Sequence, residues 1–473
     1  MFNFKHFKYF KPFLLECVEN NVRFSSSFEN IPSPRGLPLL GTTLSLILAG
    51  GPSILHKYMD KRHKELGPIF KDNVGPVQAV FLADPDEMMT VFAKEGKHPK
   101  HIKPESWLIY NEKHNYSRGL FFMDDEEWRH YRNIMNKILL KGNLSWIEDS
   151  CDIATNVLIN RIKNHSETEF LNVEHELYKW SMDVILAVLV GAKTYQQCSK
   201  EVDHLVKKLA RTVYLVFENT CKLQLIPAGL AEKFNLKRWK NFECSVKESL
   251  ELATELLDII SINYKGIEGL LYKMYEVNVD KKTINRIIID LILGAGDTTS
   301  YTMAWVLYLL SKHKHIQQEL RNNLKINPKS SYLRNTIKET LRLYPVAPFL
   351  TRFPPEDITI CGYNIPAQTL IVMSIYTSGR HSKYFKNPED FNPNRWTRGS
   401  GDSSLQQASL PFGIGARSCI GRKIAETQLQ MTVSKIVKNF NVDIVNGDEI
   451  QDILEMISKP SKPLRLIFNK VLD

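Results

Sequence analysis

The chain has 473 residues, 43% of them hydrophobic, and a mean hydropathy of −0.25. This composition is typical of a globular protein with a substantial core. The formal net charge of +10 fits a nucleic acid, an anionic membrane surface or an acidic protein as partner, and does not choose among them. The seven cysteines are scattered without a C-x-x-C pair, which argues against a disulfide framework and a zinc ribbon and favours a reducing compartment.

Residues 1–30 combine Lys5, Lys8 and Lys11 with aromatic side chains and end in a serine run. They contain no apolar stretch near the roughly 20 residues that a membrane span requires. A basic, hydroxylated and amphipathic segment predicts a mitochondrial transit peptide, although Glu16 and Glu19 are atypical of one. The alternative is an N-terminal arm, either disordered or lying on the protein surface.

The proline-rich stretch 31–41 is too rigid for a helix and predicts the start of the folded unit. Apolar runs in 67–85 predict strands, and mostly helical patterns follow from about Trp128 to Tyr344. Within them, 278–314 is apolar on most faces, which predicts a helix buried through the middle of a large protein. Short strand signals return in 357–376. We therefore expect one mainly α domain with minor β structure over 31–473.

Histidine patterns give no metal site. The thirteen histidines include no H-E-x-x-H motif. The pairs His98 with His101 and His313 with His315 are expected to be surface loop residues rather than metal ligands.

The sequence PFGIGARSCIGR at 411–422 is a glycine-rich loop, and its first interpretation is a phosphate-binding loop. A dinucleotide-binding loop needs G-x-G-x-x-G after a strand. Here Gly413 and Gly415 are followed by Ser418 in place of the third glycine, and the preceding SSLQQASL is a poor strand. The Gly-Lys-Ser/Thr of a nucleotide-binding P-loop is also missing, so both phosphate interpretations fail.

The same loop carries Cys419 just ahead of a predicted helix, whose N-terminal dipole and free N–H groups favour a thiolate. Gly415 and Gly421 would let the backbone approach a flat ligand closely. Phe412 supplies an aromatic wall and Arg417 a cation. A thiolate with these neighbours suits a haem iron and its propionates.

The segment Phe412 to Gly421 resembles the haem-thiolate loop of the cytochrome P450 family. Two further signatures of the family occur in order, E-x-x-R at Glu339 and Arg342, and P-x-R-W at Arg395. The resemblance covers 31–473 and implies the cytochrome P450 fold, with a long central helix over a buried haem b. It also implies that Cys419 is the axial ligand of the iron.

The resemblance assigns further residues to the cofactor and its support. In the family, the glutamate and two arginines of the last two motifs form a buried charge network behind the haem loop, where an unpaired charge would be costly. Arginine suits the haem propionates because its planar fork is permanently charged. The residues expected to contact haem are Cys419, Arg417, Phe412, Trp128, Arg132 and Arg352, and the network consists of Glu339, Arg342 and Arg395.

GAGDTTS at 294–300 lies inside the long apolar helix. Gly294 and Gly296 each cost about 1 kcal/mol in a helix interior, so a compensating role is expected. One alternative is close helix packing. The resemblance implies a groove for dioxygen, with the Thr298 hydroxyl bonded to a carbonyl one turn earlier and with Asp297 and Thr298 relaying protons. Ala295 departs from the glycine usual in the family.

The branch of the family follows from three features: the transit-like N-terminus, the missing membrane anchor and a basic face near the cysteine. The resemblance to mitochondrial members implies that this face docks an acidic ferredoxin, which receives electrons from its own reductase. It implies a location in mitochondria, on the matrix side of the inner membrane, and leaves peripheral membrane association open. The docking residues expected are Arg334, Lys338, Arg422 and Lys423.

The segments GLFFMDDEEWRHYR, LLKGNLSW, GAGDTTS and LRLYPVAPFLTR are similar to those of the insect mitochondrial ecdysteroid 2-hydroxylases. This resemblance implies an ecdysteroid substrate and the hydroxylation of 2-deoxyecdysone to ecdysone in moulting-hormone biosynthesis. The position of hydroxylation is implied by the resemblance alone. Candidate pocket residues are Trp107, Ala295, Val346, Phe349 and Leu350.

Three alternatives stay open at this level. The enzyme could hydroxylate another steroid or lipophilic substrate, or be a haem-thiolate isomerase, which the intact pair of Asp297 and Thr298 argues against. The basic charge could also serve nucleic-acid binding, but the sequence holds no recognised motif for it, and no nucleic-acid partner is expected.

Overall fold

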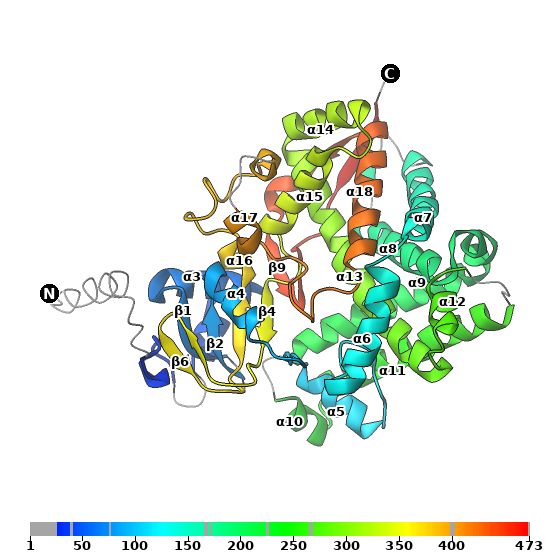
Figure 1. The fold of residues 1–473 in the computed structure, drawn as a ribbon. Coiled ribbons are helices and arrows are strands. Elements are labelled where there is room, and N and C mark those ends of the chain that lie inside the picture. The colour runs from blue at the N-terminus through cyan, green and yellow to red at the C-terminus, as the bar shows by residue number, and fades with distance from the viewer. Residues whose placement is uncertain are drawn as a thin grey trace.

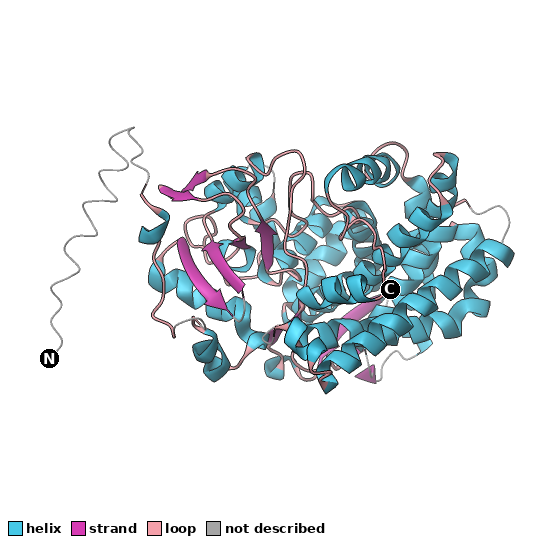
Figure 2. Ribbon diagram, turned by 90° about the horizontal axis from the view of Figure 1, so that it is seen from below, coloured by secondary structure: helices cyan, strands magenta, loops and turns pink. Residues whose placement is uncertain are grey.

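The computed structural model describes residues 26–37, 41–74, 77–164, 169–170, 173–223, 227–263, 268–397 and 403–471. The first 25 residues of the predicted transit segment lie outside these ranges. The described chain is mainly helical, and the fold class expected from the sequence is confirmed. Most strands gather at one end of the molecule beside α3 and α4, and long helices fill the other end (Figures 1 and 2).

Helices occupy most of the described chain, and they begin before the predicted limit at Trp128. Short 3-10 turns accompany them, of which η4 (Pro393–Trp396) bears on the site. Within the described ranges, no helix is both long and apolar enough to cross a membrane. The helices are α2 (Thr43–Ala49), α3 (Leu55–Leu66), α4 (Pro85–Ala93), α5 (Glu105–Lys113), α6 (Asp125–Leu139), α7 (Ser145–Asn164), α8 (Val173–Val190), α9 (Ala192–Lys222), α10 (Ala228–Lys233), α11 (Lys237–Asn263), α12 (Leu270–Glu276), α13 (Lys281–Lys312), α14 (Lys314–Ile326), α15 (Ser331–Leu343), α16 (Ile375–Ser378), α17 (Ser403–Ala408) and α18 (Arg422–Asn439).

The main sheet has the strand order β1-β2-β7-β4. β1 and β2 are the strands predicted in 67–85, and they pair antiparallel. β7 adds to β2 in parallel through pairs such as Val80 with Ile371. β5 and β6 form a separate hairpin, β3-β11-β8 a three-stranded sheet, and β9 with β10 a further pair. The strands are β1 (Ile69–Val74), β2 (Val77–Leu82), β3 (Glu169–Phe170), β4 (Phe349–Arg352), β5 (Ile358–Ile360), β6 (Tyr363–Ile365), β7 (Ile371–Ser374), β8 (Phe440–Ile444), β9 (Asp452–Glu455), β10 (Ile457–Pro460) and β11 (Leu466–Lys470).

Helix α13 is the long buried helix that the sequence predicted. It begins after Asp280, whose carboxylate accepts the Thr283 N–H at 3.0 Å and caps the first turn. Its 32 residues span about 48 Å at 1.5 Å per residue. It contacts α8, α9, α11, α15 and α18, and it runs through the middle of the molecule (Figure 1). Apolar side chains such as Ile288 and Trp305 are fully buried along it.

Candidate haem site

The loop that carries Cys419 connects α17 to α18, and the stretch judged a poor strand forms α17 instead. The Cys419 N–H donates to the Phe412 carbonyl at 2.8 Å and closes the loop. Gly413 and Gly415 have φ values of 63° and 75°, in the left-handed region that favours glycine. Cys419 therefore comes to lie just before the N-terminus of α18, whose N-cap is Gly421.

Cys419 is an exposed residue, although protein atoms are packed around its thiol. Their desolvating effect raises the pKa of the thiol, whereas the Gly421 N–H and the positive charges of Arg132 and Arg422 lower it. The groups that lower the pKa are those that stabilise a thiolate, and coordination to a metal ion removes the thiol proton outright. Cys419 can therefore serve as a thiolate ligand.

Arg132 brings α6 against this loop. Its Nη2 donates to the Ser418 carbonyl at 2.7 Å, while its Nε is buried without a partner in the described part of the chain. Burial lowers the pKa of Arg132, and the neighbouring Cys419 raises it. An unpaired guanidinium N–H next to a cysteine loop is a donor that an anionic group would satisfy. The donors present thus fit a haem with its propionates.

Arg417 is engaged with protein acceptors on the segments before α5 and α6. It donates to the carbonyls of Pro99, Leu120 and Met123 at 2.8 to 3.1 Å and to Asp124 at 3.1 Å. Burial lowers its pKa to about 10. These bonds tie the cysteine loop to the chain that precedes α6, and the haem contact of Arg417 stays a prediction.

The guanidinium of Arg417 also covers the Trp128 ring, 4.0 Å from its centroid. Trp128 is buried on α6, one turn before Arg132. Phe412 is half-buried at the start of the loop and lies under Arg422, at 5.6 Å. Each of these two rings thus packs against an arginine, Arg417 or Arg422, that lies within three residues of Cys419 in the chain.

Arg352, on β4, also has protein partners. Its Nε donates to Glu95 at 2.6 Å, and its Nη1 to the carbonyl of Thr351 at 2.8 Å. Glu95 lies beyond the end of α4, and its partners Arg352 and Ala416 follow it by 257 and 321 positions in the chain. No local sequence pattern marks such distant partners, so Glu95 was not predicted as a site residue. The propionate contact of Arg352 likewise stays a prediction.

Gly415 makes room for a protein group that the sequence did not indicate, because a Cβ there would lie 2.2 Å from the Glu95 Oε1. Its expected close approach to a flat ligand stays a prediction. At Gly421 a Cβ would meet the Cys419 Sγ at an ordinary contact distance of 4.0 Å.

His101 lies in a loop as expected, but its side chain is half-buried rather than fully on the surface. Both of its ring nitrogens are buried without a partner within the described ranges, and the ring packs edge-on against Phe121. Burial and the charges of Arg417, Lys103 and Arg352 lower the pKa of His101 to about 3. It is therefore a neutral side chain next to the arginines of the site.

The two glycines of α13 have different roles. Gly294 is exposed, and no other part of the described protein lies within 4 Å of the place where its Cβ would stand. At Gly296, by contrast, a Cβ would lie 2.5 Å from the Tyr178 hydroxyl of α8. The Thr298 hydroxyl donates to the Gly294 carbonyl at 2.8 Å, which confirms the bond predicted one turn back. Gly294 thus faces open space, whereas Gly296 permits close helix packing.

Asp297 of α13 is buried, 2% exposed, with one carboxyl oxygen unpaired in the described structure. Burial raises its pKa to about 7, although the Tyr178 hydroxyl and Lys459 oppose the shift. The Tyr178 hydroxyl is near enough to affect this pKa, but it makes no hydrogen bond to the Asp297 carboxyl within the described structure. An acid with this pKa can hold or release a proton near neutral pH.

The predicted charge network is present. Arg342 donates to both oxygens of Glu339, at 2.8 and 2.9 Å, and Arg395 donates to Glu339 at 2.7 Å. The Glu339 and Arg342 side chains are fully buried, and that of Arg395 is 9% exposed. The Trp396 indole N–H adds a bond to Glu339 at 2.8 Å. The network joins α15 to η4.

The candidate pocket residues do not form one group. The buried Trp107 donates to Thr220 of α9 at 3.1 Å. Val346 is buried in a small cluster with Tyr301 and Ile457.

The other three candidates are half-buried. Leu350 contacts the cysteine loop, 3.8 Å from where a Cβ of Gly413 would stand. Phe349 precedes it on β4. Ala295, on α13, accepts the Ser181 hydroxyl on its carbonyl at 2.9 Å. The pocket assignment of all five residues stays a prediction.

The predicted docking residues Arg334, Lys338, Arg422 and Lys423 are all exposed. Burial and the charge of Arg422 lower the pKa of Lys338, so α15 and the start of α18 contribute to the same face. Arg422 also pairs with Glu426 at 2.8 Å.

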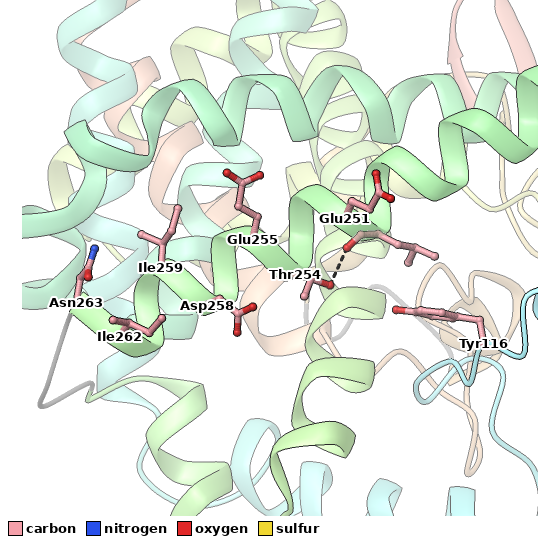
Figure 3. A pocket seen from close by; sticks show the side chains of 9 residues that line it. Tyr116, Glu251, Thr254, Glu255, Asp258, Ile259, Ile262 and Asn263 are labelled. Atoms are coloured by element: carbon pink, nitrogen blue, oxygen red, sulfur yellow. Dashed lines mark hydrogen bonds between the residues drawn. The ribbon is translucent and has the colours of Figure 1, made fainter.

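A hollow of about 590 Å³ lies elsewhere, along α11. Acidic side chains and two isoleucines surround it, with the Tyr116 ring at one end (Figure 3). The predicted site residues, all within the described ranges, do not line it. It is lined by Tyr116, Leu250, Glu251, Thr254, Glu255, Asp258, Ile259, Ile262 and Asn263.

Comparison with known proteins gives concordant results. The cytochrome P450 family model matches residues 31–468. "Cytochrome P450 315a1, mitochondrial" of Drosophila melanogaster is 35% identical over 464 residues, covering 93% of this chain and 89% of the relative. "Cholesterol side-chain cleavage enzyme, mitochondrial" of Hypanus americanus is 28% identical, covering 86% of this chain and 83% of the relative. The solved structure of retinoic acid bound cyanobacterial CYP120A1 superposes with a TM-score of 0.75 at 19% identity, over 93% of this chain and 100% of that chain, and shows the fold alone.

Proposed function

Because the chain belongs to the cytochrome P450 family, in its mitochondrial branch, and is a haem-dependent monooxygenase, we propose that it hydroxylates 2-deoxyecdysone to ecdysone. The observation that supports this substrate is the 35% identity to an insect mitochondrial relative over 93% of the chain. The similarity of four separate segments to insect ecdysteroid 2-hydroxylases agrees with it. In this proposal, 31–473 form one catalytic domain and 1–30 a transit peptide.

The haem would be held by Cys419 as iron ligand, with Arg132 and Trp128 beside its propionates and Arg352 and Arg417 supporting the same edge. When bound, the haem with its thiolate ligand supplies the activation of dioxygen. The chain's own part is to position the substrate, exclude water and deliver protons. Asp297, whose pKa is about 7, would take up a proton, and the Thr298 hydroxyl would pass it on.

The electron donor in this proposal is a mitochondrial ferredoxin with its reductase. Arg422 and Lys423 of α18 directly follow the loop that bears Cys419, and the charge of Arg422 reaches Lys338 of α15. This supports a role of these exposed cations in docking an acidic protein. Opposite charges across such a transient interface mainly raise the association rate. The proposed location is the matrix side of the inner mitochondrial membrane.

Peripheral membrane contact is supported by exposed apolar side chains on and next to two short helices. Leu48 of α2 is 80% exposed, and Phe234, which follows α10, is 68% exposed. Apolar side chains on a short helix can enter the headgroup region of a bilayer without spanning it. We assign α2 and α10 to this contact.

The test is a reconstituted reaction. The haem-loaded protein, a ferredoxin, its reductase and NADPH are incubated with 2-deoxyecdysone under air, and the product is identified by mass spectrometry and NMR. We expect ecdysone, and none when the ferredoxin is omitted. Turnover of other steroids without any ecdysone would refute the assigned substrate, and a rearranged product formed without dioxygen would favour an isomerase.

A further inference from the structure

Glu95 is a buried carboxylate for which the proposed function has no use. It follows α4 in the segment 94–101, and the residue is 7% exposed. Buried carboxylates are rare unless they are paired and hydrogen-bonded. The partners of Glu95 should therefore indicate what it does.

Each oxygen of Glu95 binds a different element. Oε2 accepts the Arg352 Nε at 2.6 Å, which joins it to β4, and Oε1 accepts the Ala416 N–H at 2.8 Å, which joins it to the cysteine loop. Ala416 lies three residues before Cys419. Both bonds involve an ionised group, and such bonds are stronger than neutral ones.

The loop conformation leaves room for this carboxylate. Gly415 has a φ of 75°, and a Cβ there would come within 2.2 Å of Oε1. A side chain at Gly415 would therefore displace Glu95. The glycine, the Ala416 N–H and the carboxylate together fix how far the loop stands from the end of α4.

Glu95 also matters for the local charge. Arg352 and Arg132 both lie close enough to Arg417 to lower its pKa. The ion pair of Glu95 and Arg352 is buried, with each side chain 7% exposed. Removing the carboxylate would leave a buried guanidinium uncompensated next to the site, and an uncompensated buried charge is strongly destabilising.

We propose that Glu95 is a positioning residue for the haem-thiolate site: it holds the Cys419 loop through Ala416 and supplies the negative charge that balances Arg352. This role does not depend on which substrate the enzyme oxidises. It acts on the iron through the position of the thiolate and through the electrostatic field around the haem.

The test uses the full chain loaded with haem and two variants that separate the two effects. Glu95→Gln keeps an oxygen that can accept the Ala416 N–H but loses the charge, whereas Glu95→Ala loses both. The matched control is Glu126→Gln, whose carboxylate pairs with Lys97 at 2.7 Å on the surface with a side chain 71% exposed. The readouts are the Soret band of the reduced carbon monoxide complex and the midpoint reduction potential.

We expect Glu95→Gln to keep the red-shifted Soret band of the parent and to shift the potential to more positive values, because a negative charge near the iron is lost. Glu95→Ala should also lose part of the red-shifted band to a form without the thiolate bond. Glu126→Gln should match the parent in both readouts.

A potential unchanged in Glu95→Gln would refute the electrostatic role, and a full red-shifted band in Glu95→Ala would refute the positioning role. If Glu95→Ala does not fold, Glu95→Asp is measured in its place. The proposal would then be overturned if Glu95→Gln and Glu95→Asp both matched the parent in the Soret band and in the reduction potential.

Discussion

Asp297 places an ionisable group in the core of the protein, where its charged form is disfavoured. Its pKa is raised from 3.8 to about 7. In the unfolded chain the carboxyl ionises first, so this residue destabilises the fold progressively as the pH rises from about 4 to about 7, and fully above that range. The penalty reaches a few kcal/mol, at roughly 1.4 kcal/mol for each pKa unit.

Asp297→Asn should remove this penalty. At about pH 8 the variant should be more stable than the parent by on the order of a few kcal/mol, and at about pH 4 the difference should vanish. Thermal unfolding of the two haem-loaded proteins at both pH values measures this. A difference that is the same at both would show that Asp297 does not titrate in this range.

Thr298 tests the proton relay. Its hydroxyl donates to the Gly294 carbonyl at 2.8 Å. Thr298→Ala should lower product formation by on the order of 10²-fold, the usual contribution of a positioned proton-transfer group. NADPH consumption should continue without matching product, and Thr298→Ser should restore much of the coupling. Coupled, undiminished turnover in the alanine variant would show that this hydroxyl relays no proton.

Site residues that belong to a short sequence motif could be predicted, whereas site residues contributed by distant segments of the chain were missed. Cys419, the Thr298 bond and the pairing of Glu339 with Arg342 were predicted from short motifs that resemble those of the family. Glu95 and Tyr178 reach the site from segments more than a hundred residues away, and no local pattern marks them. Gly415 makes room for Glu95, and Gly296 makes room for Tyr178. Because these partners could not be predicted, the roles of the two glycines could not be predicted either.

The contact between α15 and η4 depends on one buried carboxylate, Glu339, that compensates two arginines. Glu339→Gln should destabilise the protein by about 3–5 kcal/mol, because it leaves Arg342 and Arg395 buried without their anion. The control is Glu426→Gln, which breaks the more exposed pair with Arg422 and should cost about 0–1 kcal/mol. Chemical unfolding of the three haem-loaded proteins makes the comparison, and equal effects of the two substitutions would contradict it.

Elements with a strong local pattern could be predicted. The helix α13 and the strands β1 and β2 each correspond to an apolar run in their own segment. The main sheet could not be assembled from sequence, because β2 pairs with β7 about 290 positions later in the chain. Such long-range pairing depends on packing that no single segment encodes.

The molecule as a whole is basic, and part of that charge gathers on the face near Cys419. Lys338→Glu combined with Arg422→Glu should slow association with the ferredoxin by about tenfold or more at low salt, and should weaken the salt dependence. Lys247→Glu is the control, since Lys247 is exposed on α11 among acidic residues. Stopped-flow measurement of the first electron transfer at several salt concentrations gives the rates. An equal loss in the control would show that net charge, rather than this face, governs association.

The central claim for the whole molecule is that Cys419 holds the iron of a haem. The most direct measurement is the absorption spectrum of the reduced, carbon monoxide-exposed protein, parent against Cys419→Ser, each supplied with haem. We predict a strongly red-shifted Soret band in the parent and its loss in the serine variant, because the thiolate ligand produces that shift. The same red-shifted band in both proteins, or no haem band in a properly folded parent, would contradict the account.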